Sequence, residues 1–242
     1  KFLKKYGITK AIVIPIFTPD LELSLKKYNQ LMLDAVKKIK NIYGGIWVSP
    51  LPEHTKLTKK ALELLPNEKI KVLKMHSDSW PKGKYTINPA TWDEKFKKNM
   101  ELIIKTAKTY DLVIQTHTGS NNSDIIEYIP FVEEYGKGVK IHFIHMGGST
   151  SGHLAFVPRF IEWLRKGYDF YCDTSFGRGF APAWLVRVLQ AKYPKGLDRV
   201  LFASDNPWSI VESEFWKIEG INCSDRIKEK LFYNNAEKLY CR

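Results

Sequence analysis

Seven short apolar runs of β type alternate with helical patterns along the sequence. We expect strands at residues 11–17, 45–50, 70–76, 111–119, 139–146, 168–174 and 199–205. Nearly continuous apolar runs are typical of parallel strands that are covered by helices on both faces. Because no linker, internal repeat or low-complexity segment interrupts the alternation, the sequence predicts a single domain over residues 1–242.

The number of predicted strands limits the possible folds further. A closed (β/α)8 TIM barrel needs eight parallel strands, one more than the sequence offers, and the chain opens in a helical pattern at residues 1–6. The sequence therefore favours an α/β TIM barrel whose first strand is missing, that is, an N-terminally truncated domain. An open doubly wound sheet is the alternative, but no glycine-rich fingerprint follows the first predicted strand.

Composition places the chain among compact cytoplasmic proteins. Hydrophobic residues make up 44% of the sequence, enough for a core, and no apolar run reaches the length of a membrane span. The basic opening segment lacks the apolar stretch of a secretion signal. Cys172, Cys223 and Cys241 lie far apart, which is typical of reduced thiols and not of a disulfide framework.

The strong positive charge of the chain raises the question of which class of partner it binds. The formal net charge is +12, and the sequence pI is about 9.4. The lysines are scattered over the predicted helices and form no single tract, which indicates a solvated surface. We therefore expect a small-molecule substrate, with neither nucleic acid nor a membrane as partner. Electrostatic attraction of an anionic substrate and a homodimer both remain open.

Metal-binding and proton-transferring side chains recur where the predicted strands end. The third, fourth and fifth strands end in His76, His117 and His145, and the last two end near Asp173 and Asp205. In a parallel barrel the carboxyl ends of the strands meet at one rim, where active sites lie. Imidazoles and carboxylates bind divalent metals and transfer protons. The pattern therefore predicts one functional site at this rim.

We expect the remaining histidines and one lysine to lie mostly outside the functional site. Side chains alternate along a strand, so His142 is expected on the helix-facing side, opposite to His145. We expect His54 at the surface, whereas His153 lies in a loop of small residues where it could touch a substrate. Lys74 shares a face with the end of its strand and is expected to form a buried ion pair.

Four stretches, taken in order, resemble motifs of the amidohydrolase-2 branch of the amidohydrolase superfamily. The similarity runs from the second predicted strand to the C-terminus. The four stretches are DLVIQTHTG at 111–119, VKIHFIHMGG at 139–148, RVLFASDNPW at 199–208 and NNAEKLY at 234–240.

This resemblance implies a distorted (β/α)8 barrel that holds one divalent metal, with zinc expected first. It assigns His117 as a metal ligand, Asp205 as a ligand or proton acceptor, and His145 as the catalytic group that acts on bound water or substrate. The family's first strand carries a His-x-His pair, which this sequence lacks. Either residues before Lys1 supply that pair or the metal has been lost. We favour truncation, because the strand and its ligands are missing together.

Two reactions fit these residues. A metal held by imidazoles and a carboxylate lowers the pKa of bound water to about 7, and the resulting hydroxide can attack an ester, lactone or amide. The main expectation is therefore a metal-dependent hydrolase. The alternative is a metal-dependent decarboxylase of an aromatic or unsaturated carboxylic acid. A basic binding protein that keeps the fold without the metal is a third hypothesis.

Three residues are candidates for substrate binding. Arg178 stands between two glycines in a loop after the sixth predicted strand, where packing does not explain an arginine. An arginine beside aromatic side chains suits a small molecule that bears a carboxylate. Trp208 follows Asp205 in the next turn, and His76 ends the third predicted strand.

Overall fold

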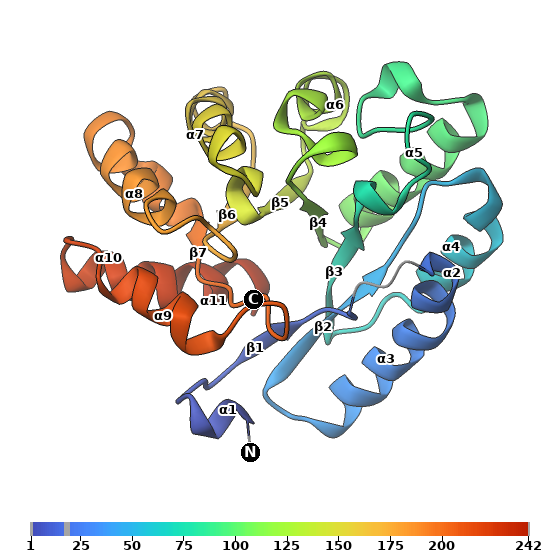
Figure 1. Cartoon of the computed structure of the whole chain (residues 1–242). Coiled ribbons are helices and arrows are strands. Elements are labelled where there is room, and N and C mark those ends of the chain that lie inside the picture. The colour runs from blue at the N-terminus through green and yellow to red at the C-terminus, as the bar shows by residue number, and fades with distance from the viewer. Residues whose placement is uncertain (1, 17–19, 242) are drawn as a thin grey trace.

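Seven parallel strands, paired in sequence order, form the centre of the molecule (Figure 1). The computed structural model describes residues 2–16 and 20–241. The strands are β1 (Ala11–Val13), β2 (Ile42–Trp47), β3 (Ile70–Met75), β4 (Val113–His117), β5 (Lys140–Ile144), β6 (Phe170–Asp173) and β7 (Val200–Leu201). This α/β architecture of the TIM-barrel type confirms the predicted class. A further strand before residue 1 stays a prediction.

Helices surround the strands on the outside (Figure 1). They are α1 (Phe2–Lys5), α2 (Leu21–Leu23), α3 (Asn29–Lys38), α4 (Thr55–Leu62), α5 (Glu94–Thr109), α6 (Tyr128–Tyr135), α7 (Thr150–Arg165), α8 (Ala181–Lys192), α9 (Val211–Glu219), α10 (Asp225–Glu229) and α11 (Asn235–Tyr240). None of these helices, in the described part of the chain, combines the length and the apolar character that a membrane crossing needs.

The helical segment before β2 begins at Leu21. Asp20 caps it, because its side chain accepts the backbone N–H of Leu23 at 2.9 Å. Ser24 is buried within the segment. The amide of Asn29 then bonds both backbone groups of Trp47, at 2.7 and 3.0 Å, and so fastens α3 to β2. Phe17, the predicted end of the first strand, lies outside the described residues.

The inner face of the sheet carries polar side chains above a small apolar floor. Leu239 and Tyr240 of α11 pack against inward-facing strand residues such as Val72 and Val113. The Tyr240 hydroxyl lies 2.7 Å from Nδ1 of His142. His142 is therefore inside the barrel, and its predicted place on the helix-facing side is wrong.

The backbone at the end of β5 explains why His142 faces the inside of the barrel. β5 ends at Ile144, and His145 has a left-handed backbone with φ of +70°. The strict alternation of strand side chains stops there, so His142 and His145 both face inward. Inside, His142 pairs with Gln115 across the sheet, and its Nε2 lies 3.0 Å from Asp173 Oδ2.

The last strand, β7, is shorter than predicted. A side chain of the C-terminal motif at 234–240 fastens it to α11. The backbone N–H of Phe202 donates to Leu231 at 2.8 Å, so the chain leaves the sheet after Leu201. The buried amide of Asn235 donates to the carbonyls of Leu197 and Val200, at 2.8 and 2.7 Å. One side chain thus joins α11 to the start of β7.

Replacing Asn235 by alanine is expected to lower the free energy of unfolding by about 1–3 kcal/mol, because it leaves two buried carbonyls without a donor. The measurement is urea denaturation followed by circular dichroism. The neighbouring Asn234 is exposed, so Asn234→Ala is the matched control and is expected to change stability little. Equal effects of the two substitutions would contradict the tethering role of Asn235.

Candidate metal centre

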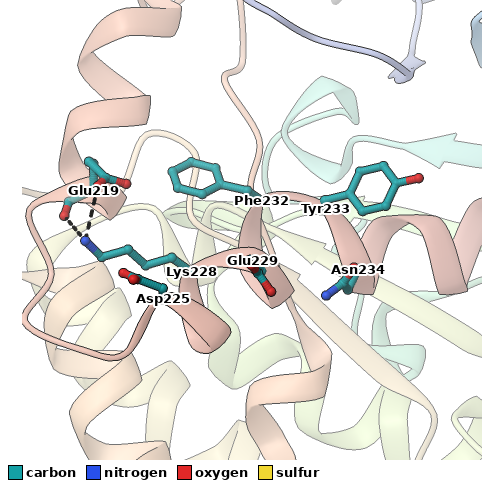
Figure 2. Close-up of a pocket in the computed structure, with 7 residues that line it drawn as sticks. All are labelled: Glu219, Asp225, Lys228, Glu229, Phe232, Tyr233 and Asn234. Atoms are coloured by element: carbon teal, nitrogen blue, oxygen red, sulfur yellow. Dashed lines mark hydrogen bonds and ion pairs between the residues drawn. The ribbon is translucent and has the colours of Figure 1, made fainter.

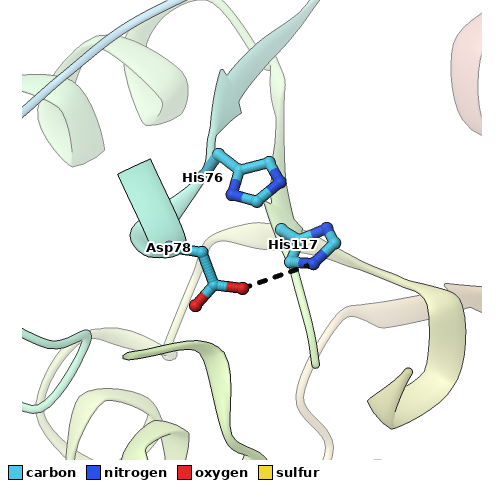
Figure 3. Close-up of side chains that lie close together, drawn as sticks. All are labelled: His76, Asp78 and His117. Atoms are coloured by element: carbon cyan, nitrogen blue, oxygen red, sulfur yellow. Dashed lines mark ion pairs between the residues drawn. The ribbon is translucent and has the colours of Figure 1, made fainter. Parts of the chain in front are cut away.

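His76, Asp78 and His117 come together at the carboxyl ends of β3 and β4 (Figure 3). One ligand atom from each lies within 4.8 Å of those of the other two. The imidazoles of His76 and His117 stack with their ring centres 3.8 Å apart, and Nε2 of His117 lies 3.7 Å from Asp78 Oδ2. Two neighbouring parallel strands therefore bring three metal-binding side chains to one edge.

His145 and Asp205 extend this group along the rim. The rings of His117 and His145 meet edge to face, with centres 4.9 Å apart. Nε2 of His145 lies 3.9 Å from Asp205 Oδ2. His145 directly follows β5, and Asp205 follows the end of β7 by four residues; both have left-handed backbones, with φ of +70° and +50°. The structure thus brings together the histidines and the aspartate that the sequence placed at one rim.

Burial sets the protonation states at the rim. It lowers the pKa of both His76 and His117 well below the usual range, with neighbouring Lys74 and the other histidines adding to the effect. Burial likewise lowers the pKa of His145 to about 4, although Asp173 opposes the shift. It raises the pKa of Asp205 to about 6, helped by the negative charge of Asp173. The imidazoles are therefore neutral at neutral pH.

These side chains fit a divalent cation. Neutral imidazoles and carboxylate oxygens are suitable donors for zinc, manganese or related metals. Among the described residues, Oδ1 of Asp78 is buried without a hydrogen-bond partner, which is costly for a carboxylate unless a cation approaches it. His76, Asp78 and His117, with His145 and Asp205 beside them, would surround such an ion.

Lys74 lies beneath this group and differs from the prediction. It is buried, and its ammonium lies 5.8 Å from the centre of the Trp47 ring. No carboxylate of the described residues comes within the 4.0 Å of an ion pair, so the expected ion pair is absent there. Burial lowers the pKa of Lys74 to about 7, although the charges of Asp173 and Asp205 act against it.

Two further histidines have structural contacts. His153 is fully buried in the first turn of α7; its Nδ1–H donates to the Met146 carbonyl at 2.8 Å, and its Nε2 accepts the backbone N–H of Arg178 at 3.2 Å. Both ring nitrogens are therefore used, so His153 links the loops after β5 and β6. His54 is half-buried and lies 3.0 Å from the Ser49 hydroxyl, so it is less exposed than expected.

The loops after β6 and β7 carry the other candidate residues. Arg178 is exposed, and Phe176 places its ring 5.7 Å from that of His145. Trp208 is 61% exposed just beyond Asp205. Their roles in substrate binding stay predictions.

Sequence reasoning missed Asp78 and Ser175. A signal existed for Asp78, which follows His76 by two residues and stands just after the end of β3. Ser175 contacts His145 through its hydroxyl at 2.9 Å. A single serine after a strand carries no distinctive pattern, so only the fold could show this contact.

Two surface hollows lie away from this rim. One, of about 430 Å³, is formed by α9, α10 and the π-helical segment Lys230–Asn234, where Lys228 bonds Glu219 (Figure 2). The other, of about 440 Å³, includes Leu65, Lys140 and Leu239. The residues that line them include neither histidine nor cysteine, so the rim group remains the candidate site.

Comparison with protein-family models identifies the chain. The model described as amidohydrolase matches residues 21–242. The chain belongs to the amidohydrolase family. This match confirms the resemblance that the four sequence motifs carried, and it makes the protein an enzyme of the amidohydrolase superfamily. No curated protein matched the sequence of this amidohydrolase.

Solved structures agree with the amidohydrolase fold. A 5-carboxyvanillate decarboxylase from Sphingomonas paucimobilis matches with a TM-score of 0.70 at 13% identity, over 99% of this chain and 81% of that one. A 2,6-dihydroxybenzoate decarboxylase from Rhizobium gives 0.65 at 13%, over 99% and 86%. A 5-carboxyvanillate decarboxylase from Novosphingobium aromaticivorans, solved with manganese and a nitrobenzoic acid, gives 0.65 at 18%, over 99% and 78%. Such identities establish the fold alone.

Lys74 is expected to make the amidohydrolase more stable as the pH rises from 7 to 9. Unfolded lysine keeps its proton up to pH 10.5, whereas folded Lys74 loses it near pH 7. The unfolded state thus binds more protons in this window, and the free energy of unfolding should rise by about 2 kcal/mol through this group.

The measurement is urea denaturation at pH 7, 8 and 9 of the wild type and of Lys74→Met. The variant should lack this rise. Lys71→Met is the control, because Lys71 stands on the same strand but is only partly buried. An unchanged pH dependence in Lys74→Met would contradict a buried lysine with a lowered pKa.

Proposed function

We propose that this amidohydrolase is a metal-dependent decarboxylase of a hydroxylated aromatic carboxylic acid. The observation that carries the proposal is the cluster of neutral imidazoles and carboxylates at one barrel rim, in which Asp205 has a pKa of about 6. Two solved relatives support this choice, because they are named as decarboxylases of 5-carboxyvanillate and of 2,6-dihydroxybenzoate.

The proposed ligands are His117 and Asp205, with His76 and Asp78 completing the donor set beside them. A bound divalent metal would supply a positive charge that orients the substrate carboxylate. Manganese is the first ion to test, since solved relatives contain it; zinc, the ion expected from the sequence, is the second.

We assign the transfer of the proton to Asp205 and His145. Decarboxylation breaks the bond between the ring carbon and the carboxylate, and carbon dioxide leaves while the electron pair stays on the ring carbon. That carbon then needs a proton. A carboxyl with a pKa of about 6 exchanges protons readily near neutral pH. Asp205 would thus serve both as a ligand of the metal and as the group that carries the proton.

Hydrolysis by a metal-activated water was the main expectation from the sequence, and it uses the same residues. The decarboxylase has more support, because three solved relatives are named as decarboxylases of aromatic acids. Arg178, Trp208 and His76 are proposed to contact the substrate, with Arg178 facing a second anionic group.

The protein loaded with Mn²⁺ is expected to release carbon dioxide from 2,6-dihydroxybenzoate or 5-carboxyvanillate, and chelation by EDTA should abolish the release. Asp205→Asn should lower kcat at least about 100-fold, because it removes the proton carrier. Asp198→Asn, on the surface beside Lys230, is the matched control. Hydrolysis of lactones without any carbon dioxide release would overturn the proposal in favour of the hydrolase.

Arg178→Ala should raise KM for these aromatic acids about tenfold or more, since an arginine–carboxylate bond contributes more than a neutral hydrogen bond. Initial-rate kinetics measure the effect. Arg187→Ala, on the exposed side of α8, removes the same charge elsewhere and should leave KM unchanged. Unaltered kinetics in Arg178→Ala would remove Arg178 from the substrate site.

A further inference from the structure

Ser175 lies behind His145 and contacts it twice. The serine is buried just after β6. Its Oγ lies 2.9 Å from Nδ1 of His145, and its carbonyl oxygen lies 3.2 Å from the same nitrogen. On the other side, its Oγ lies 2.5 Å from Oδ1 of Asp173. The serine hydroxyl therefore stands between a carboxylate and an imidazole.

The direction of these hydrogen bonds follows from what each group can donate. Oδ1 of Asp173 accepts the backbone N–H of Ser175 at 3.0 Å and that of His145 at 3.3 Å. An oxygen that receives two N–H groups acts as an acceptor, so the hydroxyl of Ser175 donates its single hydrogen to it. Its oxygen can then only accept from His145.

The proton of the neutral His145 ring is thereby fixed. Both oxygens that face Nδ1, the hydroxyl and the carbonyl of Ser175, are acceptors, so Nδ1 must carry the hydrogen. The opposite tautomer would place a lone pair against two oxygens. Nε2 is then bare and faces the rim, where Asp205 Oδ2 lies 3.9 Å away.

We propose that Ser175, held by Asp173, is a positioning residue that keeps His145 in the Nδ1–H tautomer and presents its bare Nε2 to the reacting groups. The neutral ring then acts as a base or a cation ligand and does not donate a hydrogen bond to substrate. The kinetic consequence rests on the proposed decarboxylation, whereas the tautomer does not.

The first test is the ring-nitrogen NMR spectrum of the metal-free protein labelled with ¹⁵N-histidine at pH 7.5. His145→Gln identifies the His145 signals by their loss. The wild type should show the hydrogen on Nδ1. In Ser175→Ala the signals should move toward the Nε2–H form, because one of the two acceptors is gone, and Ser175→Thr should restore the wild-type pattern.

A matched control removes a neighbouring hydroxyl. Thr174 Oγ1 is buried and has no hydrogen-bond partner among the described residues, so Thr174→Val deletes a hydroxyl of the same strand end without touching His145. This variant should leave both the ring signals and the kinetics unchanged. With the manganese-loaded enzyme, Ser175→Ala should lower kcat about tenfold with little change in KM.

Two results would overturn the proposal. One is a wild-type His145 that carries its hydrogen on Nε2, a measurement that needs no variant to fold. The other is a Ser175→Ala protein with wild-type ring signals and kinetics. If the tautomer shifts as expected while no aromatic acid is decarboxylated, the positioning role stands and the proposed function fails.

Discussion

The buried carboxylate of Asp173 is the interaction on which the interior of this barrel depends. Burial alone would raise its pKa, but the hydrogen bond and ion pair with His142, the nearby His145 ring and the Ser175 hydroxyl bring the pKa down to about 2. A buried anion is tolerated only when several donors surround it. Asp173 therefore ties β5 to β6 through His142 and the backbone of His145, and it links the floor beneath Tyr240 with the rim above.

The rim group combines bases that stay neutral with an acid that stays partly protonated. Removal from water disfavours every charged form, so it lowers the pKa of the three rim histidines and of Lys74 and raises that of Asp205. The imidazoles and carboxylates of this site can donate electron pairs to a metal ion, and the site itself carries little positive charge. Such a donor set suits a cation from solution and a substrate that is an anion.

The sequence predicted the convergence of the rim residues because that convergence depends only on strand order. His76, His117, His145 and Asp205 each follow an apolar run, and parallel strands carry their carboxyl ends to one edge. The position of His142 could not be predicted, since the left-handed backbone at His145 interrupts the alternation. The contact between Ser175 and His145 depends on how two loops fold together, which no periodicity reveals.

Binding of a divalent metal at the rim is the central claim made here for this protein. The most direct measurement is an anomalous diffraction map of the protein crystallised with Mn²⁺. We predict a manganese peak beside the imidazole of His117, within the group that includes Asp78 and Asp205. A well-ordered crystal with an empty rim, or with its manganese peak only in the acidic hollow near Glu219, would contradict it.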